Sequence, residues 1–276
     1  MRVPALTAPR AAKSVIWWRV FLAGAGLCLG AAVVELAFDA PGGAGAWTVA
    51  YGVAATTLLL GAVAYGGRRR APRRGPGASY HWLQFHVYGG TLFLALVLLH
   101  TGLRLPDGVV GWGLWSMSLW VVITGLAGVF IQKWVPTALS SGLATEVHYD
   151  RIPELVSHIR GKVEDLVAVA DESVRSFYQA NLAAGFAGPQ ARLIYFVDIT
   201  GGIQARLRHL DYLDQFLGVR DRRTVDELRS LVRTKLEMDA QYTLQRALRW
   251  WLYAHVPVAV VLTMLVMFHV YAVIYY

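Results

Sequence analysis

The sequence predicts an all-α integral membrane protein with five transmembrane helices and a large helical insert in the cytoplasm. Only 16% of the 276 residues are charged, whereas soluble domains carry about a quarter. Five runs are long and apolar enough to cross about 30 Å of hydrocarbon at about 1.5 Å per helical residue. The one long polar segment repeats its apolar residues at three- and four-residue steps, as helices do.

The five apolar runs span residues 20–38, 47–66, 82–103, 111–132 and 251–275. The first contains Glu35, and the other four contain no charged residue. The basic N-terminus resembles a signal peptide, but the apolar stretch that follows is long and no Ala-x-Ala site closes it. A second run also follows at once, so we expect a retained first helix.

The charge distribution sets the expected topology. Residues 134–250 hold fifteen basic and fifteen acidic residues, so the net charge of +8 comes from residues that flank or interrupt the apolar runs. Such juxtamembrane charge is not the footprint of a nucleic-acid-binding protein. The basic N-terminus and the five arginines of loop 67–81 predict that these segments are cytoplasmic. Residues 134–250 would then be cytoplasmic and the C-terminus outside.

The insert divides the chain into a membrane domain (1–133), the cytoplasmic insert (134–250) and a last transmembrane helix (251–276) that completes the bundle. Residues 152–181 predict a helix whose buried face is listed here: Ile152, Leu155, Val156, Ile159, Val163, Leu166, Val167 and Ala170. Thr224 and Glu227 predict a capping box, after which the helix would run directly into the fifth span. Leu193–Val197 is compatible with a short strand or a buried helical piece.

Four of the eight histidines lie inside the uncharged runs. His86 and His100 are fourteen residues apart on the third run, and His255 and His269 are fourteen apart on the fifth. Ionisable side chains in hydrocarbon are costly and usually mark functional sites. Fourteen residues are about four helical turns, so both imidazoles of one run face the same side, about 21 Å apart.

The third and fifth runs are parallel under the predicted topology, which brings His86 level with His255 and His100 level with His269. Each level can hold one haem iron between two imidazoles, and six-coordinate iron of this kind favours electron transfer. We therefore expect two b-type haems. The alternative is that each histidine only bonds a neighbouring helix. A metal-ion transporter would need more ligands at one depth.

Weaker features accompany the histidines. Gly89 follows His86 by less than one turn and would let a haem edge approach, although ordinary helix packing explains it equally well. Arg104 is the expected propionate partner on the outer side, and the arginines of 68–74 on the inner side, with lipid headgroups as the alternative. Glu35 and Asp107 are candidates for quinone protonation. The lone Cys28 excludes an iron–sulfur cluster held by this chain's own cysteines.

These residues resemble the dihaem cytochrome b family. A His-x13-His pair on each of two parallel helices resembles the cytochrome b of quinol:cytochrome c oxidoreductases. The run His255-Val-Pro-x11-His269-Val is similar to the last helix of bacterial dihaem cytochrome b subunits. The resemblance covers residues 82–132 and 251–276 and implies a bacterial inner-membrane location. The insert and the absence of a Pro-Glu-Trp-Tyr motif are departures from the quinol-oxidising family.

The resemblance implies an electron-transfer subunit of an oxidoreductase complex. It would carry electrons between a quinone pool and a redox partner such as a c-type cytochrome or an iron–sulfur protein. One alternative is a self-contained transmembrane reductase, although the insert has no Gly-x-Gly-x-x-Gly motif for a dinucleotide. Another is a non-redox anchor or scaffold. The insert histidines His148, His158 and His209 show no ligand spacing.

Overall fold

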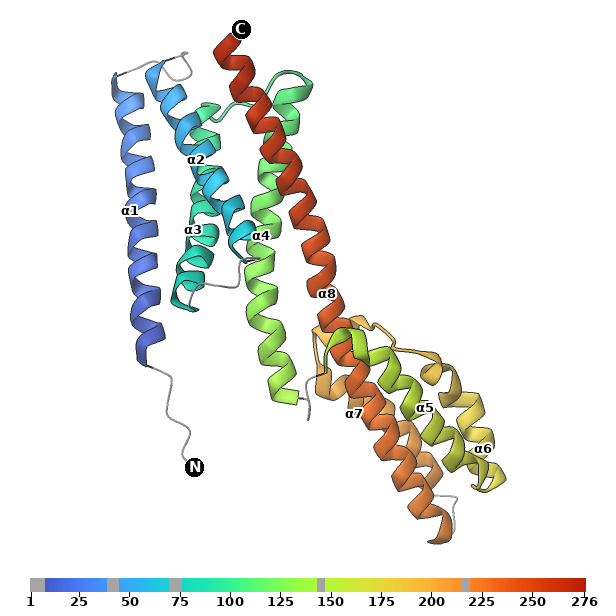
Figure 1. The fold of residues 1–276 in the computed structure, drawn as a ribbon. Coiled ribbons are helices and arrows are strands. Elements are labelled where there is room, and N and C mark those ends of the chain that lie inside the picture. The colour runs from blue at the N-terminus through green and yellow to red at the C-terminus, as the bar shows by residue number, and fades with distance from the viewer. Residues whose placement is uncertain (1–7, 39–44, 70–75, 143–146, 215–218) are drawn as a thin grey trace. The chain divides into compact units, whose positions relative to one another are not determined.

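The computed structural model describes residues 8–38, 45–69, 76–142, 147–214 and 219–276 (Figure 1). Within these ranges the chain is helical and contains no strand. The all-α prediction is confirmed for them. Leu193–Phe196 forms a 3₁₀ helix, so the strand alternative for this segment is wrong.

The chain divides into two compact units. The first comprises residues 1–129 and 252–276, and the second comprises residues 130–251. From the sequence the divisions were placed after residues 133 and 250. We call the first the membrane unit and the second the insert unit, and we describe each by itself.

Five helices are long and apolar enough to cross a membrane, as the sequence predicts. They are α1 (Ala8–Phe38), α2 (Ala46–Arg69), α3 (Pro76–His100), α4 (Gly108–Gly142) and α8 (Val219–Tyr275). A chain with five such helices is a multi-pass membrane protein by length and composition. The helix α8 includes both a polar part and the fifth apolar run, so the predicted uninterrupted helix is confirmed.

The membrane unit turns much of its apolar surface outward. On α1, for example, Leu27 and Leu29 are 77% and 69% exposed. Water would make such exposure unfavourable, whereas hydrocarbon does not. The interior is small and is formed by Tyr51, Ala55, Leu59, Phe93, Leu96, Val122 and Leu262.

Contacts between named atoms fix the helix directions within the membrane unit. Helix α2 lies against α3 in the antiparallel sense, with Thr48 beside His100 and Ala62 beside His86. Helix α4 likewise runs antiparallel to the last part of α8. Helix α3 and this part of α8 are parallel, because His86 lies beside His255 and His100 beside His269 (Figure 1).

The insert unit has a conventional apolar core. Its helices are α5 (Ile152–Ala168), α6 (Glu172–Phe177), α7 (Ile199–Asp214) and the first part of α8, with short 3₁₀ and π turns between them. The predicted face of α5 is buried at Ile152, Val156, Ile159, Val163 and Val167. Leu155, Leu166 and Ala170 pack at its edge.

Two expected helix boundaries in the insert are wrong. The helix predicted over 152–181 ends at Ala168, and α6 begins after Asp171, whose carboxylate accepts from the Ser173 hydroxyl at 2.7 Å. This hydrogen bond holds the pKa of Asp171 below its usual value. Thr224 is not a cap, because α8 already begins at Val219. No glycine or proline interrupts residues 219–223, so the helix extends one turn further.

Candidate metal-ligand site formed by four histidines

The four membrane histidines meet in the two predicted pairs. The rings of His86 and His255 lie 6.2 Å apart between centroids, with 77° between their planes. The rings of His100 and His269 also lie 6.2 Å apart, with 83° between their planes. Each pair takes one imidazole from α3 and one from α8. The structure therefore places two similar ring pairs at two levels of one helix bundle.

The ring separation suits two nitrogens that share one metal ion. Two metal–imidazole bonds of about 2.0 Å each, added to the short distances from nitrogen to ring centre, give a centroid separation of about 6 Å. Edge-to-face contact between two rings covers a similar range of separations. A shared metal ion requires an imidazole nitrogen without a proton, whereas ring contact does not. The other hydrogen bonds of each imidazole indicate which nitrogen carries the proton.

Helix α2 supplies the hydrogen bonds that orient both imidazoles of α3. His86 Nδ1 lies 2.9 Å from the carbonyl oxygen of Ala62, and His100 Nδ1 lies 2.8 Å from that of Thr48. A carbonyl only accepts, so each Nδ1 carries the proton and donates it. In a neutral imidazole the Nε2 lone pair is then available for a metal. Main-chain carbonyls that orient histidine ligands in this way are common around metal sites.

Helix α4 does the same for His255 through a side chain. His255 Nδ1 lies 2.9 Å from the Thr124 hydroxyl, which itself donates to the Trp120 carbonyl at 2.7 Å. If the hydroxyl donates to Trp120 it accepts from Nδ1, and in that tautomer Nε2 of His255 is the nitrogen without a proton. His255 is 7% exposed, and the other three imidazoles are half-buried.

Two glycines leave room for the imidazoles. An added Cβ at Gly52 would lie 3.0 Å from Cε1 and Nδ1 of His100, and one at Gly125 would lie 3.5 Å from Cε1 of His255. Any larger residue at Gly52 would push the His100 ring. Gly52 has no distinguishing mark in the sequence, because the sequence does not give the register of α2 against α3.

Two other glycines near the histidines have packing or capping roles. Gly89 is buried against α2, where an added Cβ would lie 3.7 Å from Leu58 Cδ2. Gly102 ends α3, with a φ of 59° that favours glycine. Its N–H donates to the Leu99 carbonyl at 3.0 Å, and the Leu103 N–H donates to that of Leu98 at 2.9 Å, which closes the helix. That Gly89 also borders a cofactor remains a prediction.

A buried apolar layer separates the two histidine pairs. Phe93 lies seven residues from both His86 and His100, and Leu262 lies seven from both His255 and His269. Phe93 is 4% exposed and Leu262 is 0% exposed, and both belong to the interior of the membrane unit. Seven residues are about two turns, so the midpoint residues share the face of the histidines. This seven-residue spacing is visible in the sequence, although it was not among the predicted features of the site.

The remaining candidate residues differ in their exposure to solvent. Arg104 and Asp107 are exposed in the segment between α3 and α4, and Glu35 is half-buried on α1. The side chains of the arginines at 68–74 lie outside the described residues, as does that of His209. His148 and His158 are exposed on the insert unit.

The donor set fits a haem iron better than a free metal ion. Among the described residues, no group of three or more histidine, cysteine, aspartate or glutamate side chains could hold a metal ion. Two axial imidazoles suffice for haem, whose porphyrin supplies the other four ligands. Comparisons with protein-family models, with curated proteins and with solved structures find no match to this chain.

Proposed function

We propose that this chain is a dihaem b-type cytochrome subunit that carries electrons across a membrane between a quinone pool and a redox partner. His86 and His255 would hold one haem, and His100 and His269 the other. The observation that carries the proposal is the pairing of imidazoles from α3 and α8 at 6.2 Å at both levels. The multi-pass helices and their lipid-compatible surface support a membrane setting.

The chemistry that the bound group supplies is one-electron exchange at iron. The protein's own residues would hold the group and set its surroundings. Ala62, Thr48 and Thr124 hydrogen-bond to Nδ1 of three imidazoles, which would orient these rings and keep their Nε2 atoms for the bound group. Phe93 and Leu262 exclude water between the two levels. Because each group would be held by two histidines, the proposed role is electron transfer and not oxygen chemistry.

The proposed setting is the bacterial inner membrane, with the N-terminus and the insert in the cytoplasm. The arginines of loop 67–81 support this orientation, because basic loops stay on the cytoplasmic side. The proposed partners are membrane lipids, a quinone, and a c-type cytochrome or iron–sulfur subunit. Within this proposal the chain supplies the transmembrane path and other subunits supply the donor or the acceptor.

Spectroscopy on the purified protein tests the proposal directly. We expect two haems per chain, with a reduced-minus-oxidised spectrum of b-type bands and two midpoint potentials in a redox titration. We call the His86–His255 pair the inner site and the His100–His269 pair the outer site. His100→Ala should remove the haem of the outer site and keep the bands of the inner site. His86→Ala should remove the haem of the inner site and keep the bands of the outer site. The matched controls are His81→Ala on the same helix and His158→Ala on the insert, which should keep both haems.

A full haem content in His100→Ala and His86→Ala would sink the proposal. A wild-type protein that folds and lacks haem after expression in a haem-sufficient host would also sink it. The non-redox scaffold would then be the better description of the chain.

A further inference from the structure

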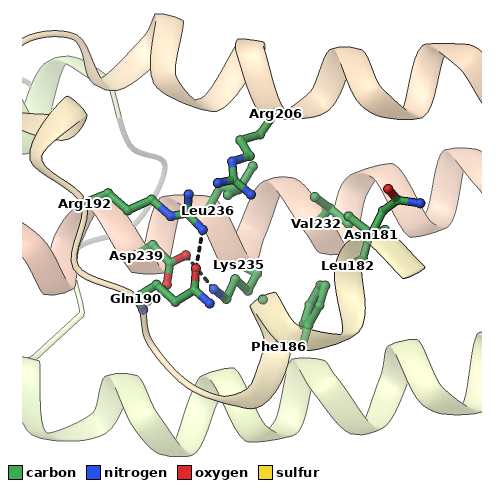
Figure 2. Close-up of a pocket in the computed structure, with 11 residues that line it drawn as sticks. Asn181, Leu182, Phe186, Gln190, Arg192, Arg206, Val232, Lys235, Leu236 and Asp239 are labelled. Carbon is green, nitrogen blue, oxygen red and sulfur yellow. Dashed lines mark hydrogen bonds and ion pairs between the residues drawn. The ribbon is translucent and has the colours of Figure 1, made fainter. Parts of the chain in front are cut away.

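The insert unit contains a cavity of about 150 Å³ with an unusual excess of positive charge (Figure 2). Three segments line it: the turn that ends at Arg192, the helix α7 through Arg206, and α8 through Lys235 and Asp239. The apolar part of its wall is formed by Leu182, Phe186, Val232 and Leu236. Three of its side chains are cationic and one is a carboxylate.

The carboxylate is already fully engaged. Asp239 Oδ2 lies 2.5 Å from Lys235 Nζ, and both side chains are less than 5% exposed. The Gln190 N–H donates to Asp239 Oδ1 at 2.8 Å. Burial raises the pKa of Asp239 and lowers that of Lys235 from their ordinary values. The pair thus anchors the turn to α8, and Arg192 acts on Asp239 through its charge without an ion pair between the two.

The two arginines have no carboxylate among the described residues. Arg192 donates through one terminal nitrogen to the Gln190 side-chain oxygen, while its buried Nε finds no acceptor in the described part of the chain. Arg206 is exposed along its length, and Figure 2 shows its guanidinium and that of Arg192 both reaching the same cavity. A buried donor without an acceptor is unfavourable, and so are two like charges at one cavity.

We infer that this cavity binds a phosphate group, either as inorganic phosphate or as a small phosphomonoester. The lining side chains sum to three positive charges and one negative charge, which leaves +2. A phosphate group carries about −1.5 to −2 near neutral pH and offers several acceptor oxygens. Guanidinium groups match such oxygens with paired hydrogen bonds. The Arg192 Nε–H and the Arg206 guanidinium supply the donors, and the apolar wall admits only a small organic substituent.

The test measures ligand-dependent protection of the insert in the full-length protein in detergent. Amide hydrogen exchange in α5, α7 and the polar part of α8 would be followed with inorganic phosphate, with glycerol 3-phosphate or with chloride, at constant ionic strength. A ligand at one hundred times its dissociation constant should slow exchange through unfolding of the insert by about 100-fold. Protection by phosphate alone assigns the free anion, and stronger protection by glycerol 3-phosphate assigns the monoester.

Arg206→Gln and Arg192→Gln should each weaken this protection at least tenfold at a given ligand concentration. Arg206 is exposed, so its replacement should leave the fold intact and decides the result if Arg192→Gln unfolds. The matched control is Arg160→Gln, because Arg160 lies on α5, pairs with Glu164 at 2.7 Å and does not line the cavity. Equal protection in wild type and Arg206→Gln, or equal protection by chloride and by both phosphates, overturns the inference.

Discussion

The membrane unit and the insert unit differ in where their large apolar side chains and their ionisable side chains lie. In the insert unit, valine, leucine and isoleucine from α5, α7 and α8 form the core, while the charged residues lie mostly outside. In the membrane unit, the large apolar residues cover the outside, and the ionisable imidazoles of α3 and α8 face one another inside. Helix α8 belongs to both units: its residues up to 251 contribute to the insert core, and its later residues contribute to the membrane unit.

This difference indicates the solvent that suits each unit. Water drives the insert's apolar residues together, so its stability comes from removing apolar surface from water. Lipid provides no such drive between helices, and packing and hydrogen bonds hold the membrane unit together. The inward hydrogen bonds of the membrane unit are accordingly concentrated on the histidines. Four predictions, from the largest effect to the smallest, test this contrast.

Two leucines that are both 0% exposed should differ in what they contribute. Leu228→Ala in the insert should cost about 2–5 kcal/mol, because it loses both transfer from water and packing. Leu262→Ala in the membrane unit should cost clearly less, because its unfolded alternative is lipid and only packing is lost. Hydrogen exchange of the full chain in lipid nanodiscs, resolved by peptide, measures both. Equal losses would contradict the contrast.

A lysine should have a large cost at one exposed apolar position and almost none at another. Leu29 on α1 is 69% exposed and Val169, after α5, is 85% exposed. Leu29→Lys should disfavour membrane insertion by about 2.5–3.5 kcal/mol, since the charge enters hydrocarbon. Val169→Lys should change stability by less than about 0.5 kcal/mol, since the residue already meets water. A glycosylation-based insertion assay measures the first, and thermal unfolding the second. An unchanged insertion efficiency of Leu29→Lys would show that position 29 does not lie in hydrocarbon.

Thr124→Val should weaken the inner histidine pair alone. It removes the acceptor of His255 Nδ1, and loss of such a partner usually lowers metal affinity by about 10–100-fold. Haem transfer to an acceptor protein would show faster release from the inner site, with the outer site unchanged. Thr124→Ser should restore retention. The matched control is Thr263→Val on α8, whose hydroxyl donates to the Ala259 carbonyl at 2.7 Å and contacts no imidazole. Equal release from Thr263→Val would rule out a positioning role.

The smallest effect concerns Tyr195, whose buried hydroxyl has no hydrogen-bond partner among the described residues. Burial raises the pKa of Tyr195 to about 12, against about 10 in an unfolded chain. Because the folded pKa is higher, the stability that this group contributes is complete below about pH 10 and is lost as pH rises toward about 12.

Tyr195→Phe should therefore leave stability at pH 7 unchanged or raise it by up to about 1 kcal/mol. It should also reduce the loss of stability between about pH 10 and 12. Urea unfolding of wild type and variant, followed in the insert at pH 7 and across this higher pH range, measures both effects. A lower stability of the variant at pH 7 would show that the hydroxyl has a partner after all.

The helices could be predicted from the sequence because apolar length and helical period are local signals. The five spans and the buried face of α5 are read from residues that lie within one helix. The ends of helices could not be predicted as well, because local hydrogen bonds compete there with continuation of the helix. Asp171 starts α6 through its bond with Ser173, and this local bond outweighs the continuing apolar pattern. Thr224 had good capping chemistry, yet the preceding residues form helix equally well.

The histidine pairs could be predicted because equal spacing on two parallel helices is a property of the sequence. The surroundings of each imidazole could not, because they depend on the register between helices. The carbonyls of Thr48 and Ala62 and the space at Gly52 have no mark in the sequence, since any residue carries a carbonyl. Thr124 is one threonine among several on apolar helices. Only the packed structure shows that it faces His255.

The division of each histidine pair between α3 and α8 has a consequence for biogenesis. His255 follows His100 by 155 residues, which a ribosome adds in roughly 10–30 s at about 5–20 residues per second. During that interval two imidazoles of α3 lie in the bilayer without their counterparts. The insert meanwhile receives its last core residues, such as Ala240 and Leu244, just before the fifth span emerges. Neither histidine pair can therefore be completed before the last part of α8 has been synthesised and inserted.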